Sequence, residues 1–251
     1  MMTRRKFLAL GAFAIPTALG IDAAVVEPGA LRIRKLELGT GIGARIVHFT
    51  DFHFKGDTRY AAEVVRRINE LAPEFVCFTG DLVEDKAFAA DALGFIRQIQ
   101  APVYGAPGNH DYRCGADFAE YQKAFAATGG EWLVDRSVVI EKFGLEIVGM
   151  ALIGIHAFKP PRARRRLLLL HYPELSDSLG TPFDLILAGH SHGGQVRLPF
   201  YGAPFLPWGV GRYDLGYFES RFGPLYVNAG IGTYYIPVRF NCRPELTVVT
   251  M

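Results

Sequence analysis

The chain has few cysteines, little net charge and no internal repeat or low-complexity segment. Its three cysteines, Cys77, Cys114 and Cys242, are an odd number without zinc-finger spacing, which excludes a disulfide framework. A bond between Cys114 and Cys242 would require the fold to bring them together, whereas Cys77 lies in an apolar run and is predicted to be a buried strand residue. Half of the 251 residues are hydrophobic, which is enough for the core of one large domain.

The amino terminus also lacks the hydrophobic run of about 20 residues that an ordinary transmembrane helix needs. Arg4, Arg5 and Lys6 precede a shorter apolar stretch, residues 7–19, and small residues follow. This pattern predicts a signal peptide over residues 1–23. The arginine pair followed by x-Phe-Leu resembles the twin-arginine signal, so we expect the twin-arginine translocase as a partner and a location in the periplasm or cell envelope. A basic amphipathic terminus without export is the alternative.

The small net charge argues against a nucleic-acid substrate. Removal of residues 1–23 would take away Arg4, Arg5, Lys6 and Asp22 and lower the formal net charge from +2 to zero. A protein that binds nucleic acid through the phosphates needs a broad positive face, which such a domain does not have. The sequence leaves open whether the segment is removed or kept as an anchor, and whether the protein contacts a membrane surface.

Polar clusters follow five short apolar runs, and each run predicts a buried strand. The runs are residues 44–50, 75–79, 102–105, 167–170 and 184–188, and apolar periodicity predicts helices at 59–71 and 86–100. Ligands at the carboxyl ends of neighbouring strands in an α/β sheet converge on one crevice. The clusters are Asp51-Phe52-His53, Gly80-Asp81, Gly108-Asn109-His110-Asp111, His171 and Gly189-His190-Ser191-His192.

Carboxylate and amide oxygens mixed with imidazoles suit a pair of small divalent cations, and such a pair is a device for hydrolysing phosphate esters. If the strand continues past residue 50, its period of two points Asp51 and His53 the same way. If the five clusters had no common function, unrelated polar groups would have to follow five strands by chance. His48 and His156 belong to no cluster and are predicted to be structural or surface residues. For Glu84 and Asp85, an acidic residue that belongs to the site and a solvated helix start are both open.

These motifs, D-x-H, G-D, G-N-H-[DE], a lone H and G-H-x-H, resemble the signature of the calcineurin-like metallophosphoesterase family. The segments 189–195, 226–232 and 237–240 resemble its exported, YkuE/YaeI-like phosphodiesterase branch. The resemblance implies an α/β fold for residues 24–251, a four-layer α/β/β/α sandwich of two mixed sheets with metals at the strand carboxyl edge.

The resemblance also implies the roles of the clustered residues. Two divalent metal ions (Mn, Fe or Zn) would share the bridging carboxylate of Asp81 and activate a hydroxide as the nucleophile. His110 would stabilise or protonate the leaving oxygen, and Asp111 could orient His110. One ion would be held by Asp51, His53, Asp81 and His192, and the other by Asp81, Asn109, His171 and His190.

We therefore expect a metal-dependent phosphohydrolase acting on a phosphoester or pyrophosphate bond. The alternatives are a UDP-2,3-diacylglucosamine-type lipid pyrophosphohydrolase and a non-catalytic metal-dependent scaffold, against which His110, His190 and His192 argue. The basic run at residues 162–166 is interpreted as a solvated loop, with contact to anionic head groups as the alternative. Residues 198–218, rich in aromatics, proline and glycine, are expected to form a wall of the site, either as internal packing or as a surface that faces acyl chains or a membrane.

Overall fold

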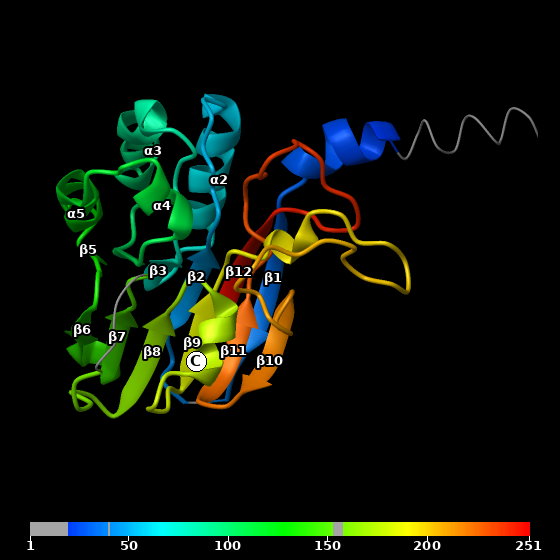
Figure 1. Cartoon of the computed structure of the whole chain (residues 1–251). Coiled ribbons are helices and arrows are strands. Elements are labelled where there is room, and N and C mark those ends of the chain that lie inside the picture. The colour runs from blue at the N-terminus through cyan, green and yellow to red at the C-terminus, as the bar shows by residue number, and fades with distance from the viewer. Residues whose placement is uncertain (1–19, 40, 153–157) are drawn as a thin grey trace, which may run out of the picture.

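Two six-stranded mixed sheets form the centre of the molecule (Figure 1). The computed structural model describes residues 20–39, 41–152 and 158–251. Most of the predicted signal segment and His156 lie outside these residues. In sheet order, the first sheet is β1 (Arg32–Glu37), β12 (Glu245–Thr250), β2 (Arg45–Phe49), β3 (Phe75–Phe78), β4 (Val103–Gly105) and β5 (Glu131–Trp132).

The second sheet has its parallel strands in the middle and antiparallel strands at its two edges. In the first sheet, β2 to β5 are parallel, and β12 runs antiparallel to β2. All five predicted strands are present, as β2, β3, β4, β8 and β9. In sheet order, the second sheet is β10 (Gly216–Ser220), β11 (Gly223–Val227), β9 (Leu185–Ala188), β8 (Arg165–Leu169), β7 (Leu145–Gly149) and β6 (Arg136–Ile140).

Helices cover the outer face of the first sheet (Figure 1). They are α2 (Thr58–Glu70), the 3-10 helix η3 (Lys86–Phe88) with α3 (Ala89–Ile96), and α5 (Phe118–Ala126). Helix α2 begins where the Asp57 carboxylate accepts a hydrogen bond from the Tyr60 N–H, which satisfies a free donor of the first turn. The helix predicted at 59–71 is confirmed. The one predicted at 86–100 begins as a 3-10 turn and ends early, in tight i to i−3 bonds at Gln98 and Ile99.

Two further apolar layers complete the core. Between the sheets, side chains such as Phe75 and Cys77 of the first sheet pack with Leu167 and Leu185 of the second. The outer face of the second sheet packs against irregular chain around Tyr213 and the 3-10 helix η5 (Pro173–Asp177). In the described residues, this outermost layer consists of loops and short 3-10 helices and not of the α-helices that the expected α/β/β/α sandwich has there. All three cysteines are free, and Cys77 is the buried strand residue that its apolar run predicts.

The interpretation of the basic run at residues 162–166 as a solvated loop holds for Arg162 and Arg164, which are exposed, and is corrected for Arg165 and Arg166. Arg165 and Arg166 begin strand β8, and Arg166 is buried with its Nε 3.0 Å from Glu146 Oε2. Arg162 Nε lies 3.3 Å from the other oxygen of the same carboxylate. A buried charge needs a partner, so Glu146 holds Arg166 within the protein. The alternative of a head-group site loses its basis for Arg166.

Candidate metal centre

The clustered residues leave their strands in strained backbone conformations. The φ angles of Asp51, His53, Asp81, His190 and His192 are 51°, 45°, 62°, 69° and 50°. This left-handed region is unfavourable for residues other than glycine, and such strain collects at functional sites. Strand β2 ends at Phe49, so the strand period does not align Asp51 with His53 as expected. The two side chains instead converge because the chain turns sharply after the strand.

The first cluster consists of Asp51, His53 and His192. Their ligand atoms lie within 4.8 Å of one another. His53 Nε2 is 3.1 Å from His192 Nε2 and 3.8 Å from Asp51 Oδ1, and His192 Nε2 is 3.4 Å from that oxygen. Two imidazole nitrogens that face each other beside a carboxylate form the arrangement that a divalent cation binds.

The second cluster is joined to the first through Asp81. Asp81, His171 and His190 place their ligand atoms within 4.8 Å of one another. One oxygen, Asp81 Oδ2, lies 3.3 Å from His171 Nε2 and 3.5 Å from His53 Nε2. Asn109 Oδ1 is 3.0 Å from His171 Nε2. A single carboxylate oxygen thus lies between the two clusters, where a bridging ligand of two ions would have to be.

Hydrogen bonds to the backbone fix which nitrogen His171 and His190 can offer. His171 Nδ1 donates to the carbonyl of Thr79 at 2.7 Å, which leaves Nε2 for a metal. His190 Nε2 donates to the carbonyl of Trp208 at 2.7 Å, which leaves Nδ1. Such outer hydrogen bonds orient metal ligands in known metalloproteins.

The electrostatics of the site fit bound cations. Asp51 is fully buried, and its Oδ1 has no hydrogen-bond partner, which is costly without a cation. Burial lowers the pKa of His53, but the carboxylates of Asp51, Glu84 and Asp81 outweigh it and raise this pKa to about 9. Burial likewise lowers the pKa of His171, and Asp81 and Asp51 raise it to about 9. The donor set therefore favours positive charge in a buried position, and the residues present fit a pair of divalent metals.

Glycines allow the ligand-bearing loops to touch. A Cβ atom added at Gly108 would lie 2.2 Å from Asp81 Oδ1, and one added at Gly189 would lie 2.5 Å from Asp51 Oδ2. Both distances are far below a possible contact. These two motif positions therefore need glycine for the loops to approach the carboxylates.

The structure places Glu84 at the imidazole of His110. Glu84 Oε2 lies 3.2 Å from His110 Nδ1, and Glu84 Oε1 lies 2.8 Å from Nδ1 of the predicted ligand His53. One carboxylate thus joins a metal ligand to the candidate general acid. The sequence did not decide the role of Glu84. Its position three residues after Asp81 was the signal that could have identified it as part of the site.

The expectation that Asp111 orients His110 is corrected. Asp111 Oδ2 accepts hydrogen bonds from the backbone N–H groups of Asp81 and Gly108, at 2.9 and 2.8 Å. Asp111 Oδ1 accepts from the N–H of Leu82 at 3.0 Å. The buried carboxylate of Asp111 therefore ties the loop that carries Asp81 to the loop that carries Asn109, rather than contacting the imidazole as expected.

Sequence reasoning missed Tyr234. Its ring centroid lies 4.9 Å from that of His110, 5.8 Å from that of His53 and 6.2 Å from that of His192. Arg113, which follows His110 on α4 (Asn109–Arg113), hydrogen-bonds to Tyr234. Tyr234 lies in a segment without regular structure near the carboxyl end, so neither periodicity nor a motif marks it.

Of the predicted wall, residues 198–218, the structure places Pro204, Phe205, Pro207 and Trp208 at the site. The carbonyl of Trp208 contacts His190, and a cavity of about 480 Å³ is lined by His192 together with Phe205, Tyr234 and Ile236. His48, in contrast, is a structural residue: it is buried, its Nε2 is 2.9 Å from Thr79 Oγ1, and burial lowers its pKa to about 3 despite Asp51.

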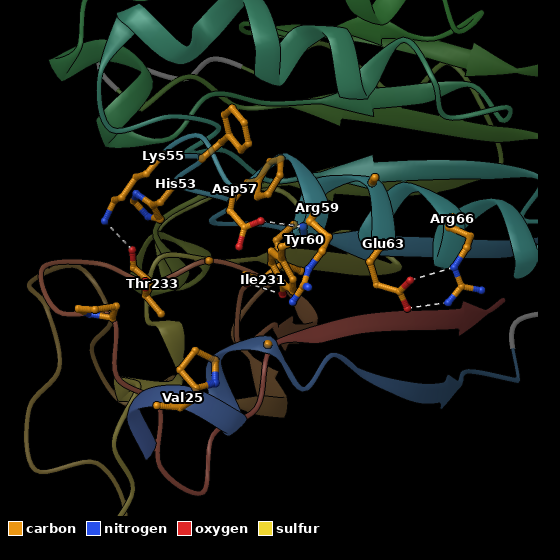
Figure 2. A pocket seen from close by; sticks show the side chains of 17 residues that line it. Val25, His53, Lys55, Asp57, Arg59, Tyr60, Glu63, Arg66, Ile231 and Thr233 are labelled. Atoms are coloured by element: carbon orange, nitrogen blue, oxygen red, sulfur yellow. Dashed lines mark hydrogen bonds and ion pairs between the residues drawn. The ribbon is translucent and has the colours of Figure 1, made fainter. Parts of the chain in front are cut away.

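A larger hollow of about 800 Å³ lies beside His53, between α2 and residues 231–233 (Figure 2). Most of its charged groups already have partners in the protein. Lys55 Nζ donates to the carbonyl of Thr233 at 3.0 Å, and Arg66 pairs with Glu63. We therefore assign the metal chemistry to the two clusters and not to this hollow.

Residues 44–194 match the model of the calcineurin-like phosphoesterase family. The chain belongs to this family. It is therefore a phosphoester-hydrolysing enzyme, and its His and Asp clusters are candidate sites for divalent metals.

Known relatives and a solved structure agree with this assignment. The chain is 28% identical to the metallophosphoesterase YkuE of Bacillus subtilis (strain 168), over 100% of this chain and 98% of YkuE. It is 29% identical to the phosphodiesterase YaeI of Escherichia coli (strain K12), over the whole of both chains. It is 25% identical to the UDP-2,3-diacylglucosamine pyrophosphatase LpxG of Chlamydia trachomatis, over 94% of each. A crystal structure that is 12% identical superposes with a TM-score of 0.51, over 74% of this chain and 90% of the other, which supports the fold.

Proposed function

We propose that the chain hydrolyses a phosphodiester or pyrophosphate bond with the help of two divalent metal ions. The observation that carries this proposal is the position of Asp81 Oδ2, within 3.5 Å of histidines from both clusters. A mononuclear site would not need a carboxylate at that place. When bound, two divalent ions supply charge neutralisation at the phosphoryl oxygens and activate water near neutral pH.

The remaining work falls to the side chains around the metals. His110 is buried beside the clusters and belongs to neither of the two ligand sets, so its imidazole can hold a proton for the leaving oxygen. Glu84 fixes the orientation of that imidazole through Nδ1, and thereby directs Nε2 toward the site. The ring of Tyr234 packs against the imidazoles of His53 and His110 and limits the access of water and substrate from that side.

For the substrate, a lipid-linked pyrophosphate is the second candidate. It is favoured by the similarity to LpxG and by the apolar cavity that His192 shares with Phe205 and Ile236. A soluble diester would use the same metal centre but would leave this cavity without a role. Manganese, iron or zinc would each suit the nitrogen and oxygen ligands.

We further propose that the enzyme is exported by the twin-arginine translocase and acts in the periplasm or cell envelope. The support is the sequence Arg4-Arg5-Lys6-Phe7-Leu8 and the apolar stretch that follows it. These residues lie outside the described part of the chain. Among the helices of the described ranges, none has the length and apolarity needed to cross a bilayer.

A metal-reconstituted activity screen tests the proposal. Metal-free protein would be loaded with Mn, Fe or Zn and assayed on phosphomonoesters, phosphodiesters and a diacylated sugar nucleotide. We expect hydrolysis of diesters or pyrophosphates only after loading, and none in Asp81→Asn. Activity that is equal with and without metal would refute the metal-dependent reaction. Cleavage of soluble diesters with no turnover of the lipid would remove the second candidate.

A further inference from the structure

One face of the molecule exposes large apolar side chains in unusual number. On the loop between η6 (His192–Gly194) and β10, the exposed fractions are 45% for Leu198, 111% for Phe200, 74% for Tyr201, 72% for Phe205 and 80% for Trp208. No charged residue occurs from position 198 to 211. Isolated exposed apolar residues are ordinary, but a contiguous group of them marks an interaction surface.

Two neighbouring segments extend this group. Tyr235 and Ile236 are 83% and 56% exposed. The π-helix η1 (Asp22–Val26) adds Val25, which is 73% exposed. Backbone hydrogen bonds hold the three segments together, since the N–H of Arg239 donates to Ala23 and the N–H of Arg197 donates to Phe240. All three lie on the same side of the molecule (Figure 1). We call this surface the apolar face.

The tip of the loop is strained at Phe200. Leu198 and Gly202 exchange backbone hydrogen bonds of 2.8 and 3.0 Å, which close a tight hairpin around Phe200. Phe200 has a φ of 65°, a conformation that favours glycine or asparagine. The ring of Phe200 is completely exposed, so no packing contact within the protein offsets the free-energy cost of this backbone conformation. A strained residue that contributes nothing to packing points to a function outside the fold.

We propose that the apolar face docks on a lipid bilayer, with Phe200, Tyr201 and Trp208 entering its interfacial region. Aromatic side chains on an uncharged loop suit the boundary between head groups and acyl chains. The sequence just before η1 supports a bilayer over a protein partner, because residues 7–19 are apolar and join the described chain beside Ile21 on this face. The cavity that includes Phe205 and His192 then connects the bilayer to the metal centre.

The tryptophans of the chain provide a direct test. There are two, of which Trp132 is buried and Trp208 is 80% exposed, so a change in surroundings is reported by Trp208. The full chain would be mixed with vesicles of phosphatidylethanolamine and phosphatidylglycerol. We expect a blue shift of the emission and quenching by brominated acyl chains. Absence of both would overturn the proposal, even if residues 7–19 hold the protein on vesicles. A blue shift that depends on protein concentration without vesicles would also overturn it, in favour of a second copy of the chain.

A matched pair of variants tests the loop itself. Phe200→Asn with Tyr201→Ser should weaken vesicle binding at least tenfold, because two large apolar side chains are lost from the lipid contact. The single variant Phe200→Asn should weaken binding while leaving the melting temperature unchanged or higher, since asparagine tolerates the left-handed conformation. Tyr217→Ser removes an exposed ring from β10 and serves as the control. Binding by the double variant that equals that of the control would refute the role of the loop.

This docking goes beyond the proposed reaction and can fail independently of it. Hydrolysis of a small soluble ester should be unchanged in Phe200→Asn, because the ring lies at the loop tip and does not line the cavity with His192. If the unmodified protein does not hydrolyse the soluble ester, that result would count against the proposed function. Loss of vesicle binding alone would count against the apolar face.

Discussion

At the scale of single residues, Asp81 has the most connected position in the site. It is buried, and its Oδ1 accepts the N–H of His110 at 2.7 Å while its Oδ2 lies between the two histidine clusters. The side chain thus joins the metal ligands to the backbone of the candidate general acid. A change at this position should affect metal binding and geometry together.

For Asp81→Asn, we expect loss of activity and of metal at both positions, because an amide has no negative charge to share between two cations. Elemental analysis of the metal-loaded variant measures this directly. Asp91→Asn changes an exposed carboxylate on α3 and should retain the metal content of the unmodified protein. Two metals per chain in Asp81→Asn would rule out the bridging role.

The contact between Glu84 and His110 leads to a second residue-scale prediction. His110→Ala should keep its metals and lose about 10²–10⁴-fold in turnover on substrates with poor leaving groups. Glu84→Gln should lose about 10–100-fold, because the imidazole is then less well oriented. Both losses should be larger on alkyl esters than on p-nitrophenyl esters. Equal losses on the two ester types would show that His110 positions the phosphoryl group instead of protonating the leaving oxygen.

At the scale of elements, the site depends on how the loops after β3 and β4 are joined. Asp111 connects them through three backbone N–H groups. Burial and the nearby charge of Asp81 raise the pKa of Asp111 to about 6, although these hydrogen bonds lower it. Its position is that of a structural clamp, which holds both sets of ligands at the edge of the first sheet.

We expect Asp111→Ala to destabilise the protein by about 3 kcal/mol or more, since each buried group left unsatisfied costs about 1–3 kcal/mol. In a chain of this size the melting temperature should fall by roughly 6–12 °C. Asp117→Ala removes an exposed cap of α5 and should cost only about 1 kcal/mol. Thermal unfolding of both variants provides the comparison. An unchanged melting temperature in Asp111→Ala would refute the clamp.

At the scale of the whole molecule, η1, at the start of the described chain, lies on the same side as the other segments of the apolar face (Figure 1). A protein carried across a membrane by the signal that precedes η1 in the sequence would already have the apolar face near the lipid. The metal centre opens into the cavity between Phe205 and Tyr234, so catalysis and docking would share one side of the molecule.

Export can be tested separately from docking. We expect Arg4→Lys with Arg5→Lys to leave a folded, active enzyme in the cytoplasm, because lysine keeps the charge but not the guanidinium geometry. Cell fractionation with an activity assay measures this. Normal export of the double variant would indicate the general secretory route. Lys35→Arg, on β1, is a control that should not change the location.

Much of the fold and site could be predicted from the sequence because both follow local rules. Five apolar runs became strands, and within each sheet the candidate ligands follow parallel strands that end at the same edge. The packing of the two sheets, which brings their ligands together, was decided by the tertiary structure. The reason for glycine at positions 108 and 189 came only from the structure, where a Cβ atom would meet the carboxylates of Asp81 and Asp51.

The partners of charged and apolar side chains were decided by the tertiary structure. His110 and Asp111 are adjacent in sequence, but neighbours on a helix point in different directions, so Glu84 from another loop reaches the imidazole instead. Arg166 became buried because β7 supplies Glu146 opposite it. Composition alone could not distinguish internal packing from exposure for residues 198–208. Their exposure follows from the hairpin that turns Phe200 away from the core, a contact pattern set by distant residues such as Phe240.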